Sequence, residues 1–183
     1  ERVEDLSGYL DPFYSHYIVR ESNHNRLLAF AQASSRPVIN AMSSMAHPCE
    51  VLTDAYFINQ SVRPMSEATI CLWGPTTNVF RSWHELASVI GVNVVHICDE
   101  RYHEKDSVIR FDTGPSGPVD VVVIDSWPED SGVPIPLTED HLSGMGSPAL
   151  LPTPPYSIGR ELTFDPLRYQ RFLGYSQKQW LLP

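Results

Sequence analysis

Three short, largely apolar runs constrain the fold of this chain more than any other feature of its sequence. They cover Thr69–Trp73, Val92–Cys98 and Val119–Ile124, and each has the length of a strand. A strand that is apolar throughout is typical of a parallel sheet covered by helices on both faces. A helical pattern over Val79–Ile90, ended by Gly91, lies between the first two runs, and parallel strands need crossovers of this kind. The sequence therefore predicts an α/β fold with a Rossmann-like parallel sheet.

The N-terminal part repeats this alternation on a smaller scale. We expect a helix over Val3–Leu10, a strand over Tyr17–Arg20, a helix over Asn25–Ala33 and a strand at Val38–Ile39. Because this alternation starts without a preceding strand, we expect it to be part of a second α/β domain that is incomplete at its N-terminus. Apolar surface around Ile18 and Val38 would then be covered by another chain or by a missing N-terminal segment.

The later part of the chain contains shorter elements, and most of the sixteen prolines lie there. We expect a strand-like segment at Val108–Phe111, one or two helical turns over Leu137–Leu142 capped by Thr138, and a brief strand at Ala149–Leu151. A last helix is predicted over Leu167–Leu173, with Gln177–Leu182 as its candidate extension.

Composition excludes several classes of partner. The formal net charge of -9 disfavours nucleic acid, which requires a basic surface, and no apolar run approaches the roughly 18 residues that span a membrane. The 42% hydrophobic content is sufficient for a core.

The three cysteines, Cys49, Cys71 and Cys98, are odd in number and fit no zinc spacing. We therefore expect reduced thiols, a cytoplasmic protein and no metal. The turn at Gly74–Asn78 lacks the G-x-G-x-x-G pattern, so no dinucleotide or other cofactor is expected.

One motif in the first third points to anion binding. The strand at Val38–Ile39 is followed by His47-Pro48-Cys49-Glu50 and then by a helical pattern of Leu52, Ala55, Tyr56 and Ile58. Proline suits the first turn of a helix, so His47 is predicted to lie at a helix N-terminus. Free N–H groups and the positive end of the helix dipole favour a phosphate or a developing oxyanion there. The alternative is a histidine that only caps the helix.

Asn40-Ala41 followed by His47-Pro48-Cys49 and an apolar helix resembles the aspartate/ornithine carbamoyltransferase family, whose motif is His-Pro-Cys-Gln or His-Pro-Thr-Gln. The resemblance is collinear from about residue 1 to 182. It implies a carbamoyl-phosphate domain ending in residues 1–48, a linking helix in 49–64 and an amino-acid-binding domain in 65–183. It also implies a homotrimer, or assembly with the missing N-terminal segment. The family's Ser-x-Arg-Thr phosphate loop would lie upstream, and no such motif occurs in these 183 residues.

The same resemblance suggests which residues contact carbamoyl phosphate. Arg20 is similar to the family's arginine that grips the phosphate, and a guanidinium suits bidentate anion binding. His47 resembles the histidine that donates to the carbamoyl carbonyl and stabilises the oxyanion. Arg171 is similar to a C-terminal arginine of the phosphate site, with Arg168 as the alternative. Each arginine could instead be an ordinary surface residue.

Residues expected to bind the second substrate follow two of the apolar strands. Asn78 resembles the asparagine that binds the α-carboxylate or α-amino group of ornithine, and Ser82 follows it as in the family. Asp125 resembles the aspartate of an Asp-x-Trp motif and would pair with an ammonium, although it could be only a turn former. Aspartate enzymes carry arginine at the asparagine position, so an ornithine-like amine is expected, and the acidic loop Glu129-Asp130 favours a cation further.

Three departures from the family pattern leave the activity open. Glu50 replaces a glutamine that contacts the carbamoyl group, and residues 128–132 replace a Ser-Met-Gly segment. Residues 152–155 replace a His-Cys-Leu-Pro loop, so Thr153 can hydrogen-bond but supplies no thiolate. The chain is therefore an active carbamoyltransferase, a diverged homologue with different or no catalysis, or an interaction subunit whose partner carries the phosphate loop.

Overall fold

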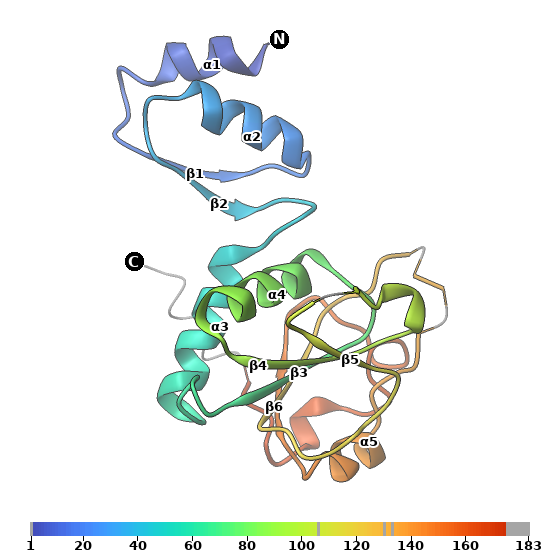
Figure 1. The fold of residues 1–183 in the computed structure, drawn as a ribbon. Helices are drawn as coiled ribbons and strands as arrows, with labels where there is room; N and C mark the ends of the chain where they lie inside the picture. The colour runs from blue at the N-terminus through green and yellow to red at the C-terminus, as the bar shows by residue number, and fades with distance from the viewer. Residues whose placement is uncertain (1, 106, 130, 133, 175–183) are drawn as a thin grey trace.

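The computed structural model describes residues 2–105, 107–129, 131–132 and 134–174. Figure 1 shows a small N-terminal unit, a larger sheet-containing unit and helix α3 (Pro48–Ser61) between them. The N-terminal unit contains α1 (Val3–Leu10), β1 (Tyr17–Arg20), α2 (His24–Ala33) and β2 (Val38–Met42). These elements match the predicted ones to within a few residues at their ends.

In the N-terminal unit, β1 and β2 pair in parallel, and Tyr17 lies opposite Val38. The Tyr17 ring is buried and meets Phe30 of α2 edge-on, with 5.0 Å between the ring centroids. Asp11 accepts hydrogen bonds from the Tyr17 hydroxyl and from the backbone N–H of Ser35, and the latter bond holds the pKa of Asp11 well below its usual value. Successive side chains alternate between the faces of a strand, so Ile18 points the other way and is 68% exposed.

The larger sheet has five strands, β3 (Thr69–Trp73), β4 (Asn93–Ile97), β5 (Arg110–Asp112), β6 (Val121–Ile124) and β7 (Ala149–Pro152). Their order in the sheet is β5-β4-β3-β6-β7, and each neighbouring pair is parallel. The predicted Rossmann-like parallel sheet is therefore confirmed. Because the strands on the two sides of β3 are reached in opposite directions, the sheet has a switch point between β3 and β6, where such folds place ligands.

Helices and ordered loops cover both faces of this sheet. Residues of α3 and α4 (Asn78–Ile90) pack against one face, in a cluster that includes Ile58, Phe80 and Trp83. The other face packs against α5 (Glu139–Gly144) and the segment around Leu162. As predicted, Thr138 caps α5, and Gly91 ends α4 with a φ of 74°. Burial on both faces explains why β3, β4 and β6 are largely apolar.

The buried face of helix α3 agrees only in part with the apolar pattern of Leu52, Ala55, Tyr56 and Ile58. Val51, Ala55 and Ile58 are buried, whereas Leu52 is 58% exposed and Tyr56 is 50% exposed. No helix of the described residues has both the length and the apolar character needed to cross a membrane.

The predicted helix over Leu167–Leu173 is wrong. The structure has only a short 3-10 helix, η2 (Pro166–Arg168), and the chain then runs beside β7. The Leu150 N–H donates to the Arg171 carbonyl, and the Leu173 N–H donates to the Leu150 carbonyl. These backbone groups bond to a strand, which leaves them unable to form helical hydrogen bonds. The candidate extension at Gln177–Leu182 lies outside the described residues.

We expect Ile58→Ala to lower the free energy of unfolding by about 2–5 kcal/mol, since Ile58 is fully buried between α3 and the sheet. Leu52→Ala on the same helix is the matched control and should cost less than about 1 kcal/mol. Urea denaturation followed by circular dichroism measures both. Equal losses for the two variants would mean that α3 packs through another face.

Candidate functional site

A cavity of about 600 Å³ lies at the carboxyl ends of β3, β6 and β7 and reaches the N-terminal unit. It is lined by residues from both units, among them Arg20, His47, Glu50, Asn78, Asp125 and Thr153. These side chains come from five separate segments of the sequence. The structure therefore brings together most of the residues that the motifs singled out.

His47 is the N-cap of α3, and Pro48 occupies the first turn of that helix, as predicted. The His47 backbone N–H donates to the Ser82 hydroxyl at 2.8 Å, so Ser82 lies behind the cavity wall and fixes the start of α3. Glu50 lies in the first turn and is 6% exposed. An acidic side chain at this position interacts favourably with the helix dipole.

Asn78 begins α4 and ties the two units together. Its side-chain amide donates to the Ser43 carbonyl at 2.7 Å, in the loop that leads to His47. Thr77 caps α4 by accepting from the Phe80 N–H. Arg81 lines the same cavity one turn further along α4, and the sequence analysis missed it. Its spacing of three residues from Asn78, which places both on one helix face, is the signal that could have found it.

Asp125 follows β6 directly and is 6% exposed. Its carboxylate accepts from the Ser126 N–H at 2.8 Å and from the Thr77 hydroxyl. Burial raises the pKa of Asp125 to about 6, although both hydrogen bonds lower it. The carboxylate is therefore mostly ionised at neutral pH and can accept hydrogen bonds from a cation.

Asp54 lies one turn beyond Glu50 on α3 and is fully buried. Burial, and then the negative charge of Asp125, raise the pKa of Asp54 to about 8. Asp54 is therefore mostly protonated at neutral pH. The sequence analysis missed this residue, although an acid four positions after Glu50 on a helix with a buried face was visible in the sequence.

The loop after β6 is held against the turn after β3. Gly74 has a φ of +119°, and a side chain there would collide with the indole ring of Trp127. Glu161, which is 1% exposed, accepts from the backbone N–H groups of Trp127 at 3.0 Å and Ser157 at 2.7 Å. These contacts fix the backbone that follows Asp125.

Two threonine hydroxyls on the cavity wall have no hydrogen-bond partner among the residues that the structure describes. They belong to Thr76, after β3, and Thr153, after β7. Buried polar groups in folded proteins are nearly always paired, so unpaired ones on a cavity wall are candidates for ligand contacts. Thr153 was predicted to bind substrate, whereas Thr76 was not.

Arg171 does not reach this cavity. Its guanidinium donates to the Ser147 carbonyl at 3.1 Å, and Ser147 precedes β7, at the opposite end of that strand from the cavity. The alternative, Arg168, pairs with Asp165 at 3.8 Å. Within the described ranges, His, Cys, Asp and Glu side chains form no group of three or more that could hold a metal ion.

The comparisons with known proteins identify the relatives of the chain. Residues 1–60 match the family model described as aspartate/ornithine carbamoyltransferase, carbamoyl-P binding domain. An ornithine carbamoyltransferase of Chlorobaculum tepidum is 28% identical over 110 residues, which are 60% of this chain and 32% of that protein. A second, from Caulobacter vibrioides, is 28% identical over 140 residues, which are 69% of this chain and 45% of that protein. The chain thus spans about a third to a half of the length of these relatives.

Solved structures support the same fold. The ornithine carbamoyltransferase of Burkholderia thailandensis superposes with a TM-score of 0.87 at 20% identity, covering 100% of this chain and 67% of that one. The doubly wound sheet, with a helix N-terminus beside a polar cavity, places the fold with the carbamoyltransferases. The chain is similar to the aspartate/ornithine carbamoyltransferases, and the curated relatives given above are ornithine enzymes, as the motifs predicted.

Asp54 makes stability depend on pH. Its pKa rises from 3.8 in the unfolded chain to about 8 in the folded one, so unfolding releases a proton between these values. The contribution of Asp54 to stability is therefore greatest below pH 3.8 and is lost as the pH rises through about 8. We expect Asp54→Asn to become progressively more stable than the wild type as the pH rises from 5 to 8.

Urea midpoints of the wild type and Asp54→Asn at several pH values test this. Asp140→Asn, an exposed acid of α5, is the control and should show no such trend. A difference between wild type and Asp54→Asn that stays constant with pH would contradict the raised pKa.

Proposed function

We propose that the chain transfers a carbamoyl group from carbamoyl phosphate to the amine of an ornithine-like amino acid. The observation that carries this proposal is the shared cavity of Arg20 and His47 with Asn78 and Asp125. The matched region is described as a carbamoyl-phosphate-binding domain, and the relatives are ornithine carbamoyltransferases. The cavity contains groups suited to an anion on one side and to an ammonium on the other.

On the anion side, Arg20 offers a planar guanidinium to the phosphate, and the N-terminus of α3 adds its dipole. The His47 imidazole donates to the carbamoyl oxygen and stabilises the negative charge that develops there as the amine attacks. The amine nitrogen bonds to the carbonyl carbon, and the bond from that carbon to the phosphate oxygen breaks. Positioning and electrostatic stabilisation supply the catalysis, without a covalent intermediate on the protein.

On the amine side, Asp125 accepts from an ammonium group of the second substrate. Asn78 and Arg81 lie on the same face of α4 and suit its carboxylate. Thr153 contributes a hydroxyl where the resemblance places a thiol. This set of groups fits an amino acid that carries a further amine, such as ornithine.

Glu50 favours a second candidate function. An ionised carboxylate that faces an anionic substrate is repelled by it, and like charges about 4 Å apart cost on the order of 1–4 kcal/mol, more as exposure to water decreases. A diverged homologue that binds an amino acid or amine without carbamoyl transfer would avoid that cost. An interaction subunit completed by a chain with the phosphate loop is the third hypothesis.

Assembly and domain organisation belong to the same proposal. We keep residues 1–48 as part of the carbamoyl-phosphate domain, 49–64 as the linking helix and 65–183 as the amino-acid-binding domain. Exposed Ile18 and Ile39 on the N-terminal sheet support association through this face, either in a homotrimer or with a further N-terminal segment. Free cysteines are consistent with a cytoplasmic location.

We expect Arg20→Gln to weaken binding of carbamoyl phosphate at least about tenfold, because it removes a charge-assisted contact to the phosphate. Arg26→Gln is the matched control, since Arg26 pairs with Glu21 outside this cavity. Isothermal titration calorimetry of the 183-residue chain, and of any longer product of the same gene, measures both. Equal affinities for wild type and Arg20→Gln would remove Arg20 from the site.

We expect the wild type to bind ornithine more tightly than aspartate, and Asp125→Asn to reverse or abolish this preference by removing the acceptor for the ammonium. Asp140→Asn should leave the preference unchanged. Calorimetric titration with each amino acid, with and without carbamoyl phosphate, measures it. Tighter binding of aspartate by the wild type would show that the amine side of the cavity is misassigned.

A further inference from the structure

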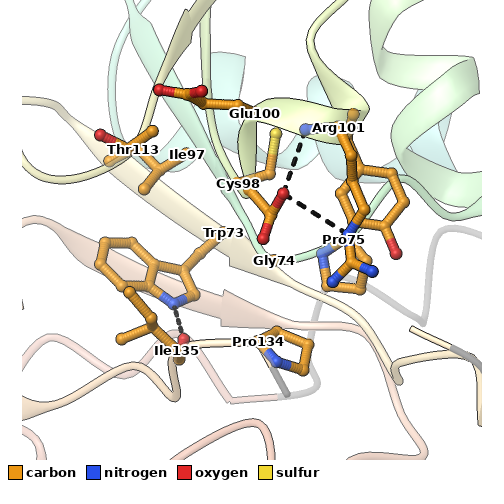
Figure 2. Close-up of a pocket in the computed structure, with 12 residues that line it drawn as sticks. Trp73, Gly74, Pro75, Ile97, Cys98, Glu100, Arg101, Thr113, Pro134 and Ile135 are labelled. Atoms are coloured by element: carbon orange, nitrogen blue, oxygen red, sulfur yellow. Dashed lines mark hydrogen bonds and ion pairs between the residues drawn. The ribbon is translucent and has the colours of Figure 1, made fainter. Parts of the chain in front are cut away.

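A second, smaller cavity lies at the carboxyl ends of β3 and β4 (Figure 2). Its volume is about 320 Å³. Gly74 and Pro75 line it, whereas the next residues of the same turn line the larger cavity. The turn after β3 therefore separates the two cavities, and the function proposed for the larger one does not use the smaller one.

Flat and apolar side chains form much of the wall of this cavity. Trp73 and Ile97 come from the ends of β3 and β4, and Pro134 and Ile135 lie across from them (Figure 2). The Trp73 indole N–H donates to the Ile135 carbonyl at 2.8 Å, so the indole has no unpaired polar group there. Trp73 is only 3% exposed and packs on the His141 ring, so Pro134 and the 63% exposed Ile135 offer the accessible apolar surface against which a planar heteroaromatic ring could pack.

Hydrogen bonds within the protein connect the two walls of the cavity, so no ligand is needed to position them. The guanidinium of Arg101, just after β4, donates to the Ser131 carbonyl at 2.9 Å. The same guanidinium packs against Gly132, where a side chain would collide with it. Together with the bond from Trp73 to Ile135, these contacts connect residues 131–132 to the segment after β4 and residue Ile135 to β3. The cavity is therefore formed before any ligand arrives, as most small-molecule sites are.

The polar edge of the cavity is the carboxylate of Asp99, the second residue after β4. One of its oxygens accepts from the Arg101 backbone N–H at 3.0 Å and lies 3.5 Å from Nε of the same residue. This fixes the carboxylate at the cavity edge. Its side chain is still 53% exposed, so it can accept further hydrogen bonds.

The position of Asp99 in the fold indicates which ligand groups would donate hydrogen bonds to it. In doubly wound sheets an acidic residue after the second strand binds the ribose hydroxyls of a nucleotide, whose phosphates lie at the helix N-terminus after the first strand. Here β3 is the first strand and β4 the second, and Thr113 follows the third. Pro75, Thr76 and Thr77 replace the glycines that a pyrophosphate would require.

We propose that this cavity binds a ribonucleoside, with its base against Pro134 and Ile135 and its 2′- and 3′-hydroxyls donating to Asp99. A volume near the lower limit of ligand sites fits one nucleoside rather than a dinucleotide. Residues Gly74–Asn78 do not form a glycine-rich turn. We therefore expect the cavity to recognise the base and the sugar of the ligand rather than a pyrophosphate.

Calorimetric titration of the chain with adenosine, and separately with guanosine, tests the proposal. We expect at least one of them to bind with a dissociation constant on the order of 0.1 mM. The 2′,3′-dideoxy analogue of that nucleoside should bind at least about tenfold more weakly, because it lacks both donors to Asp99. No binding of either nucleoside at millimolar concentration, or equal binding of the dideoxy analogue, overturns the proposal.

Asp99→Asn should weaken nucleoside binding to a similar extent. Asp165→Asn is a closely matched control, since Asp165 also caps a three-residue 3-10 helix and pairs with a nearby arginine, but lies outside the cavity. An Asp99→Asn protein that binds the nucleoside as tightly as the wild type places the ligand elsewhere and overturns the assignment. Since neither ligand nor variants involve Arg20 or Asp125, the result is independent of carbamoyl transfer.

Discussion

The backbone of Gly74 is the constraint on which both cavities depend. Its N–H donates to the Ile97 carbonyl at 2.9 Å, and its carbonyl accepts from Nε2 of His96 at 2.8 Å. The indole of Trp127 lies against its α-carbon, in the space that any side chain would need. These contacts fix the turn between β3 and α4 relative to β4 on one side and to the loop after β6 on the other. The same turn orients Thr77, which contacts Asp125, and Asn78, which contacts Ser43.

Burial keeps the histidines beneath this turn neutral. His96 is fully buried, and burial lowers its pKa to about 3, while the pKa of His84 is lowered to about 4 for the same reason. Because Nε2 of His96 donates to a carbonyl, Nδ1 of the same ring accepts from Nε2 of His84 at 3.1 Å. The turn is thus held by a neutral hydrogen-bonded pair whose protonation the surrounding apolar residues disfavour at physiological pH.

The carboxyl groups around the larger cavity are kept in different protonation states by their surroundings. Asp54, inside α3, has a pKa of about 8 and is mostly neutral at pH 7, whereas Asp125, with its two hydrogen bonds, has a pKa of about 6. The negative charge of Asp125 is one cause of the raised pKa of Asp54. Of these two carboxyl groups, Asp125, which lines the cavity, therefore carries a negative charge, whereas Asp54, which does not line it, is mostly neutral and adds little repulsion of an anionic ligand.

Features of the sequence that act locally predicted much of the fold. Largely apolar runs identified β3, β4 and β6, and capping residues placed the ends of α4 and α5, since each depends on neighbouring residues alone. Prediction failed where distant contacts decide the outcome. The apolar spacing around Leu167 suggested a helix, yet β7 offers that backbone a strand partner, and the same pairing carries Arg171 away from the larger cavity. Motifs found Arg20, His47 and Asp125, but Glu161 supports the site through the backbone of Trp127, a contact no sequence spacing reveals.

The larger cavity exists only because the N-terminal unit is tied to α4 at two points. Ser43 and His47, in the loop between β2 and α3, bond to Asn78 and Ser82, which lie one turn apart on α4. Arg20 reaches the cavity from the carboxyl end of β1, where it lies opposite Met42 of β2 and therefore beside the same loop. Asn78 therefore bonds to the loop that carries His47 and also lines the side of the cavity that we propose for the amine, called the amine side. A ligand that competes for its amide would loosen one of the two ties, so occupancy of the amine side is coupled to the position of His47 through a single side chain.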